Sequence, residues 1–474
     1  MSVSHVAEER RPPEAPELAV RASRSLVSDA KYVVGGRIAG VAGTALVAFL
    51  LPRCLTPEDC GKFLVAQNIL GLGALVAGAG LPLAILRILG EGLARGDREW
   101  TWAALARSLV VLAVSSCVVT AGMLLWLISG GAAWLQLDMR WSWLLAFAAG
   151  LMLLAWQWVL VEAIRGLGEL RFASLFAGGQ SGGPFAALVF AATLLMSYQA
   201  WPISALQTQL LYAAALLLTL PGVLVGLRVA WRGAALGEVA KLRESSQSSP
   251  SVSSLLAVCL PICATQLLAF LTLAADLPIA GVFCPPGEVA LLGQARRLLL
   301  VLQLPGQAAV MTILASAARL HAEGKTDELQ GLVRRATTIG ALCVLPPALL
   351  LLAAPGDVMA IFFGEFYRGG ASLLVVLSLG QLVAVYNGMA GYVLIVSGRQ
   401  HSVVLVNGLT AALMLTVGPV SAAFGGVLGL AVAASAILAL QNTLEWLLAR
   451  RLLQVSTHFD WRSLTSLGRR AINT

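Results

Sequence analysis

Twelve apolar stretches, each long enough to cross a lipid bilayer, follow one another along the 474 residues of this chain. The hydrocarbon core of a bilayer is about 30 Å thick, and a helix needs about 20 apolar residues to cross it. Charged residues make up only 12% of the chain, against about 25% in a typical soluble domain. The pattern therefore predicts an all-α polytopic membrane protein whose working groups lie among the helices.

Charge in the loops predicts the topology of these spans. Arginine and lysine gather in every second loop, whereas the loops between hold only Arg53, Lys62, Arg140 and Arg368. Cytoplasmic loops are enriched in these residues, so we expect a multi-pass protein of the inner (cytoplasmic) cell membrane with both termini cytoplasmic. The net charge of +8 reflects this topology, and no nucleic-acid partner is expected. The predicted spans are Tyr32–Leu51, Phe63–Ala84, Ala104–Ile128, Trp141–Val161, Phe172–Met196, Ser204–Val229, Leu255–Val282, Val289–Leu314, Ala336–Ala353, Ala371–Val396, Ser402–Ala423 and Val427–Ala449.

A Ser-rich polar segment in the middle of the chain separates six spans from six. The predicted parts are a disordered cytoplasmic tail over 1–31, a six-helix lobe over 32–230, a cytoplasmic linker over 231–253, a second six-helix lobe over 254–453 and a cytoplasmic tail over 454–474. The halves share a short pattern, because Gly96 and Gly324 lie 228 residues apart, as do Arg107 and Arg335. Transporters built from repeats bind substrate between them near the midplane.

Short motifs in both halves follow one another in a familiar order. Leu55-Thr-Pro-Glu-Asp-Cys-Gly61 follows the first span, and Asp276-Leu-Pro-Ile-Ala-Gly-Val-Phe283 precedes Ala295-Arg-Arg-Leu298 in the second half. Phe362-Phe-Gly-Glu-Phe366 comes further on. Over Ser28–Leu453 this order resembles the polysaccharide (oligosaccharide-lipid) flippases of the multidrug/oligosaccharidyl-lipid/polysaccharide exporter superfamily.

The resemblance implies a V-shaped bundle of two lobes, with a central cavity lined mainly by spans 1, 2, 7 and 8. It also implies a transporter that moves a polyprenyl-pyrophosphate-linked oligosaccharide from the cytoplasmic to the outer leaflet by alternating access, for surface polysaccharide biosynthesis. The implied partners are the lipid-linked glycan, membrane lipids and the polysaccharide polymerase or ligase machinery. The chain itself is then not an enzyme.

Charged residues within the spans are the first site candidates. Arg37 lies in the first span, and Arg296 and Arg297 lie in the eighth. By translocon scales such a residue at the bilayer centre costs about 2.5–3.5 kcal/mol, so it usually faces the bundle interior. The resemblance implies that Arg37 meets the pyrophosphate, and we expect Arg296 or Arg297 to do the same. The alternative for Arg37 is a side chain that snorkels to the cytoplasmic interface.

Asp276 is the acidic candidate. It lies ten residues before Pro286, at the turn between spans 7 and 8, and Arg296 lies ten residues after it. At a rise of 1.5 Å per residue both lie about 15 Å from the turn, so we expect Asp276 to pair with Arg296 or Arg297. Either the pair is structural, or one arginine is free for cargo while Asp276 responds to a coupling ion, H⁺ or Na⁺. No other cofactor is expected.

Uncharged polar residues recur within the spans, and each can bind either a glycan hydroxyl or a neighbouring helix. Interhelical hydrogen bonds of this kind are worth about 0.6 kcal/mol each and are the default explanation. We select Gln67, Asn68 and Gln303 as substrate-binding candidates because the resemblance places their spans at the cavity. The remaining ones are Gln157, Gln266, Gln307, Gln381, Asn387, Asn407, Gln441 and Asn442.

Two other functions stay open. A cation-coupled multidrug antiporter of the same superfamily would use an acidic cavity, whereas this chain places arginines in its spans. A membrane glycan polymerase or ligase needs catalytic groups in a sizeable outer loop, and Pro355–Gly370 offers only Asp357, Glu365 and Arg368. The sequence contains no Gly-x4-Gly-Lys-Ser/Thr phosphate-binding motif, so no nucleotide hydrolysis is expected.

Overall fold

The computed structural model describes residues 35–36, 38–137, 140–178, 182–197, 202–234 and 251–460. Within these residues the chain is helical almost throughout and has no β-strand; the one pairing of extended chain is a bridge between Leu55 and Ile203. Eight of the described helices are long and apolar enough to cross a membrane, and the shorter helices Ile38–Cys54 and Gly183–Met196 are also apolar. The predicted all-α, multi-span fold class is confirmed.

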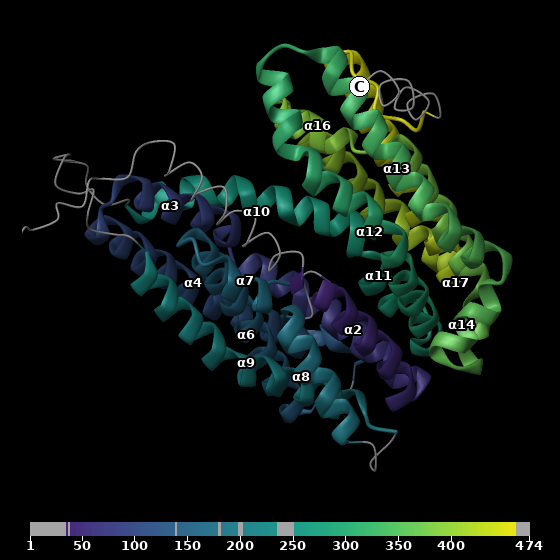
Figure 1. Cartoon of the computed structure of the whole chain (residues 1–474). Coiled ribbons are helices and arrows are strands. Elements are labelled where there is room, and N and C mark those ends of the chain that lie inside the picture. Colours follow the sequence, from purple (N-terminus) through teal and green to yellow (C-terminus); the bar gives the residue numbers. More distant parts are fainter. Residues whose placement is uncertain are drawn as a thin grey trace, which may run out of the picture.

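The helices form two groups, which we call the first and the second bundle (Figure 1). The first bundle consists of Ile38–Cys54, α2 (Pro57–Ala77), α3 (Leu81–Arg95), α4 (Arg98–Trp126), the π-helical turn η1 (Leu127–Gly131), α5 (Ala132–Trp134), α6 (Trp141–Gly166), α7 (Leu170–Phe176), α8 (Gly183–Met196) and α9 (Ala205–Gly233). The second bundle consists of α10 (Val252–Ala274), α11 (Asp276–Phe283), α12 (Pro286–Ala322), α13 (Thr326–Ala353), α14 (Pro355–Phe363), the 3₁₀ helix η4 (Glu365–Gly370), α15 (Ala371–Asn387), α16 (Ala390–Val396) and α17 (Gln400–Leu453).

Several predicted spans are interrupted or joined in ways that the apolar pattern did not indicate. Helix α17 has 54 residues and covers the last two predicted spans, which meet without a loop at Gly426, where the backbone has φ 57° and ψ −151°. The seventh span is broken between α10 and α11, immediately before Asp276. At this break the Leu277 N–H donates to Asp276 Oδ1 over 2.9 Å, so the carboxylate satisfies one of the amides that the interruption leaves free.

The two bundles pack together along α2 and α12, and α11 also contacts α2 (Figure 1). α2 begins with Pro57 at its first position, after Thr56, whose hydroxyl accepts from the Asp59 N–H over 3.2 Å. At this end Gly61 lies directly against α12, because a Cβ at Gly61 would overlap the Pro286 carbonyl oxygen. The absence of a side chain at Gly61 therefore allows the bundles to approach closely.

After α17 the chain turns back across the second bundle, and we call Gln454–Asp460 the C-terminal strap. Val455 and Thr457 of the strap are fully buried. The Arg334 side chain donates to the Ser456 carbonyl over 3.1 Å, and the Thr457 hydroxyl donates to the Asn387 carbonyl over 2.7 Å. The strap thereby connects α13 to the end of α15, within the region predicted as the cytoplasmic tail 454–474.

Candidate functional site

A cavity of about 590 Å³ lies among the helices of the second bundle, in the size range of about 300–1,000 Å³ that is usual for ligand pockets. Its walls come from α10, α11, α12, α13, α15, α16 and α17, and α2 of the first bundle closes one side. No described residue of the Ile38–Cys54 helix lines it. Spans 2, 7 and 8 were predicted at the cavity, whereas α13, α15 and α17 were not.

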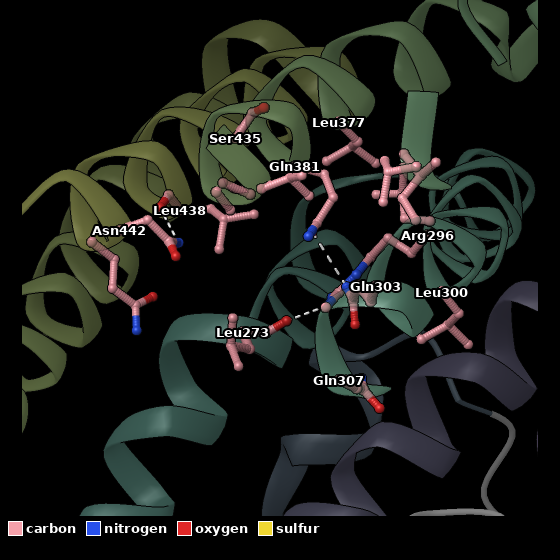
Figure 2. Close-up of a pocket in the computed structure, with 18 of the residues that line it drawn as sticks. Leu273, Arg296, Leu300, Gln303, Gln307, Leu377, Gln381, Ser435, Leu438 and Asn442 are labelled. Atoms are coloured by element: carbon pink, nitrogen blue, oxygen red, sulfur yellow. Dashed lines mark hydrogen bonds between the residues drawn. The ribbon is translucent and has the colours of Figure 1, made fainter. Parts of the chain in front are cut away.

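The cavity brings together six of the seven residues that the sequence selects. These are Gln67, Asn68, Asp276, Arg296, Arg297 and Gln303. The seventh, Arg37, lies outside the described residues. Figure 2 shows Arg296, Gln303 and Gln307 on one wall, with Gln381 and Asn442 on the opposite side.

Asp276 and Arg296 form an ion pair, so the predicted pairing is made by Arg296. The Asp276 side chain is only 4% exposed and that of Arg296 26%. A second guanidinium nitrogen of Arg296 donates to the Leu273 carbonyl, which belongs to the last turn of α10 (Figure 2). The break between α10 and α11 therefore supplies both the carboxylate and a carbonyl to one arginine, and the charge of Arg296 is neutralised within the protein.

Arg297 points in a different direction, because neighbouring positions of a helix project about 100° apart. Its guanidinium lies near Cys60 of α2 and Tyr367 of η4, and its Nη1 atom is buried without a hydrogen-bond partner. Within the described part of the chain, no ion pair is formed by Arg297. Arg297 is thus a cation that lines the cavity and has no anionic partner among the residues that the structure describes.

Amide side chains occupy most of the remaining polar wall. Gln303 donates to Gln381 over 3.4 Å, a long contact, and Gln441 donates to Asn407 over 2.8 Å. The other amide atom of Gln441, Oε1, is buried without a partner. Gln381 and Gln441 stood out in the sequence as polar residues in apolar spans, but nothing in the pattern distinguished them from residues that only join helices.

One end of the interface between the bundles is closed by direct contacts. Gln136, after α5, donates to the Cys284 carbonyl over 3.1 Å. Arg53 lies over the Phe49 ring and donates to the Ile361 and Phe362 carbonyls at the end of α14. These segments are the loops that the charge pattern predicts to be outer. The bundles are joined at this end and diverge toward the other (Figure 1).

No protein-family model matches the chain, and no curated protein matches it in sequence. Solved structures do match it over most of its length. A multidrug resistance MATE family transporter of the MOP superfamily, in its inward-facing conformation, is 16% identical, with a TM-score of 0.71 over 87% of this chain and 94% of that one. The lipid II flippase MurJ, in an inward closed conformation, is 11% identical, with a TM-score of 0.60 over 92% and 89%. A mutant of the Vibrio cholerae MATE transporter VcmN is 14% identical, with a TM-score of 0.58 over 91% and 98%.

At these identities the likeness establishes the fold. The chain has the fold of MOP-superfamily transporters, which the multidrug transporters and the lipid flippase share. This agrees with the superfamily that the motifs resemble, and the similar structures are transporters rather than enzymes. The fold does not distinguish a polysaccharide flippase from a multidrug exporter, so the cargo has to be argued from the cavity.

Proposed function

We propose that the protein flips a polyprenyl-pyrophosphate-linked oligosaccharide from the cytoplasmic to the outer leaflet of the inner membrane, for surface polysaccharide biosynthesis. The observation that carries the proposal is Arg297, whose half-buried side chain lines the cavity and whose Nη1 atom is buried without a hydrogen-bond partner among the described residues. A cation held away from water is stable only when it is paired. A pyrophosphate supplies such a partner, because its oxygens match the fork of N–H donors on arginine.

The charge balance of the cavity supports an anionic cargo. Among the residues that the structure describes, its charged lining consists of two arginines and one aspartate, a net charge of +1. Asp276 already neutralises Arg296, so the excess positive charge belongs to Arg297. Arg37, outside the described residues, stays a proposed second contact to the pyrophosphate. Its replacement by alanine should abolish glycan export while the protein still reaches the membrane.

Alternating access requires the closed outer end of the two bundles to open. Release of cargo to the outer leaflet requires the contacts of Gly61 with Pro286 and of Gln136 with Cys284 to separate. We propose that Asp276, held in the Arg296 pair, responds to H⁺ or Na⁺ and so couples the cavity to this movement. Asp276→Glu and Asp276→Asn should then differ in transport, and equal transport at equal protein levels would make the pair structural.

Both termini are proposed to be cytoplasmic, with a glycan polymerase or ligase as partner machinery.

The alternative is a cation-coupled multidrug antiporter, which the same fold supports equally well. Such a protein would bind cationic cargo through a carboxylate, and of the described residues that line this cavity Asp276 is the acidic one. Its carboxylate is 4% exposed and occupied by Arg296, which favours the anionic cargo. A membrane polymerase or ligase is less well supported, since Asp357, Glu365 and Arg368 bind one another at the outer end.

Binding of farnesyl methyl pyrophosphate to the full-length protein in lipid nanodiscs tests the proposal. Replacing Arg297 with glutamine should weaken binding about 10- to 100-fold, because a hydrogen bond to a charged group is worth about 1.5–3 kcal/mol. Arg87→Gln, which changes an exposed cation paired with Glu91, is the control and should have no effect. Unchanged binding in Arg297→Gln would refute the assignment. Asp276-dependent uptake of ethidium would instead support the antiporter.

A further inference from the structure

Helix α15 ends at a break inside the second bundle, and the short helix α16 begins just beyond it. At the break Gly388 has φ 76° and ψ −147°, a conformation that glycine adopts without strain. Gly388, Met389 and Tyr392 line the cavity, so the chain beyond the break forms part of its wall. α16 lies at the end of the second bundle that is away from α14 (Figure 1).

α16 lies apart from the main apolar core. None of its residues, all of which the structure describes, belongs to the continuous core that the two bundles share. Ala390 and Leu394 pack in a small cluster with α17, and Val393 packs in another with α12 and α13. Between α12 and α16 a gap of about 10 Å³ remains, about the space of one water molecule. Met389 and Tyr392 line both this gap and the cavity, so a movement of α16 away from α12 would open the cavity on this side.

The C-terminal strap covers the break between α15 and α16. The Phe459 N–H donates to the Tyr386 carbonyl over 2.9 Å, and the Thr457 hydroxyl donates to the Asn387 carbonyl over 2.7 Å. Carbonyls in the last turn of a helix have no partner within that helix, so the strap supplies what the break removes. The strap also lies directly on the break, because a Cβ at Gly388 would come within 2.5 Å of the Thr457 carbonyl oxygen.

The strap also covers α16 with an apolar side chain. Val455 is 1% exposed and belongs to the same small cluster as Val393 of α16, Leu320 of α12 and Val333 of α13. Hydrogen bonds and an ion pair bind the neighbouring strap residues to α13. The docked strap thus joins α16 to the first half of α13.

We propose that α16 is a movable wall of the cavity, hinged at Gly388, and that the docked C-terminal strap holds it closed. Undocking uncovers two carbonyls of α15 and the side chain of Val393, and α16 then rotates about the glycine, which tolerates the change in backbone angles. The gap beside α12 widens and joins the cavity to the side of the membrane on which the strap lies. This device controls access to the cavity and applies equally to an anionic lipid cargo and to a cationic drug.

Cysteine labelling of the full-length protein in lipid nanodiscs tests the proposal. The three cysteines that are not buried, Cys117, Cys263 and Cys343, are first replaced by serine. Met389→Cys reports on the movable wall, because the native side chain is 8% exposed and lines the gap. Ser378→Cys reports on the body of the bundle, because Ser378 is fully buried in α15 before the break. A water-soluble maleimide is added, and peptide mass spectrometry gives the labelling rate at each position.

Thr457→Val removes the hydroxyl that donates to the Asn387 carbonyl and keeps the shape of the side chain. Loss of this hydrogen bond should raise the labelling rate of Met389→Cys about 2- to 10-fold, because the open state becomes more populated. The rate at Ser378→Cys should not change. Thr219→Val is the matched control, since Thr219 is a fully buried hydroxyl that donates to a carbonyl of the first bundle, and it should leave both rates unchanged.

Val455→Ala is the second strap variant, and it provides the result if Thr457→Val fails to fold. Removal of two methyl groups from the buried cluster should raise labelling of Met389→Cys about 10-fold. Val223→Ala, at a fully buried valine of α9, is its control. A rise at Met389→Cys alone supports the proposal. An equal rise at Ser378→Cys would mean that the strap only stabilises the fold, and unchanged labelling at both positions would mean that it does not hold α16; either result overturns the proposal.

Discussion

The two bundles are made of similarly apolar helices, yet one is packed closed and the other encloses a cavity. The buried share of the most apolar stretch ranges from 28% in Arg98–Trp134 to 61% in α6 of the first bundle, and from 17% in α10 to 39% in Glu365–Asn387 of the second. Glycines let the first bundle pack tightly: a Cβ at Gly166 would come within 3.1 Å of Leu89 Cβ on α3. The first bundle is therefore the scaffold, against which the second carries the polar cavity.

Polar groups differ between the bundles in the same way. Ser108 and Thr219 of the first bundle donate to carbonyls of their own helices, at 2.8 Å each. Hydroxyls of the second bundle, such as that of Thr410, do the same, but this bundle also holds the ion pair between Arg296 and Asp276 and an arginine, Arg297, with no carboxylate partner among the described residues. A polar residue in a span can thus either bond to a carbonyl of its own helix or contribute to the cavity. Only the surrounding helices show which of the two applies.

The largest effect is expected from breaking the ion pair of the second bundle. Asp276→Ala leaves Arg296 without its counter-charge, which should destabilise the protein by about 3–5 kcal/mol. Removing both partners should cost less than removing Asp276 alone, because no uncompensated charge remains. The measurement is the free energy of unfolding, in detergent, of Asp276→Ala, Arg296→Ala and the variant that carries both changes. A double variant less stable than Asp276→Ala would contradict the pairing.

A smaller effect is expected where the bundles meet. Gly61→Leu introduces a side chain against the Pro286 carbonyl, and overpacking of this kind costs about 1–3 kcal/mol. We expect the outer ends of the bundles to move apart. Gly90→Leu is the matched control, because nothing lies within 4 Å of a Cβ at Gly90.

Spin labels report this separation. Ser129 of the first bundle and Glu365 of the second are exposed at the outer end and accept labels as cysteine variants, once the exposed Cys117 and Cys343 are replaced by serine. The distance between the labels should lengthen in Gly61→Leu and stay the same in Gly90→Leu. An unchanged distance in both variants would mean that Gly61 is not a point of closure.

Two amides sharpen the contrast between scaffold and cavity. Gln157, buried in the first bundle, donates to the Gly182 carbonyl, and Gln157→Leu should cost about 1–3 kcal/mol of stability by leaving that carbonyl unpaired. Gln381→Leu in the cavity should cost less than about 1 kcal/mol, because its bond to Gln303 is long. Denaturant unfolding compares the two. Equal losses would remove the distinction between them.

The smallest effect concerns the C-terminal strap. Burial, together with the nearby cations Arg334 and Arg450, lowers the pKa of His458 when the strap is docked, and Asp460 opposes this only in part. The docked strap therefore binds fewer protons than the free strap. Docking should be strongest above the ordinary histidine pKa of about 6.5 and weaken as the pH falls below it.

Hydrogen exchange of the strap amides tests this dependence. Exchange should quicken between pH values of about 7 and 5.5, after correction for intrinsic rates. His458→Gln should make the corrected rates independent of pH in this range, since the titrating group is gone. The same acceleration in His458→Gln would show that His458 is not the group responsible.

More of the fold than of the candidate site could be predicted from the sequence. Each predicted span lies on helix, as far as the described residues extend, although the last two share α17; a span is recognised from the sum of about 20 residues. The break before Asp276 and the kink at Gly426 were missed. Each involves one or two residues, and each depends on neighbouring groups rather than on apolar length.

The depth of a charged group in the membrane and its direction around the helix were not equally predictable. Ten residues on either side of Pro286 place Asp276 and Arg296 at one depth, and the structure pairs them. The choice between Arg296 and Arg297 was left open. It depends on α10 and α11 lying on one side of α12, with Cys60 and Tyr367 on another.

By itself the sequence determined the all-α, multi-span class of fold and the shared depth of Asp276 and Arg296, because apolar length and the rise of a helix are properties of each segment alone. Only the tertiary structure decided that the second bundle is hollow, that Arg296 is neutralised and that Arg297 has no carboxylate partner within the described part of the chain. Those outcomes depend on which helices are neighbours, and a side chain's direction around its helix has consequences only once the neighbours are in place.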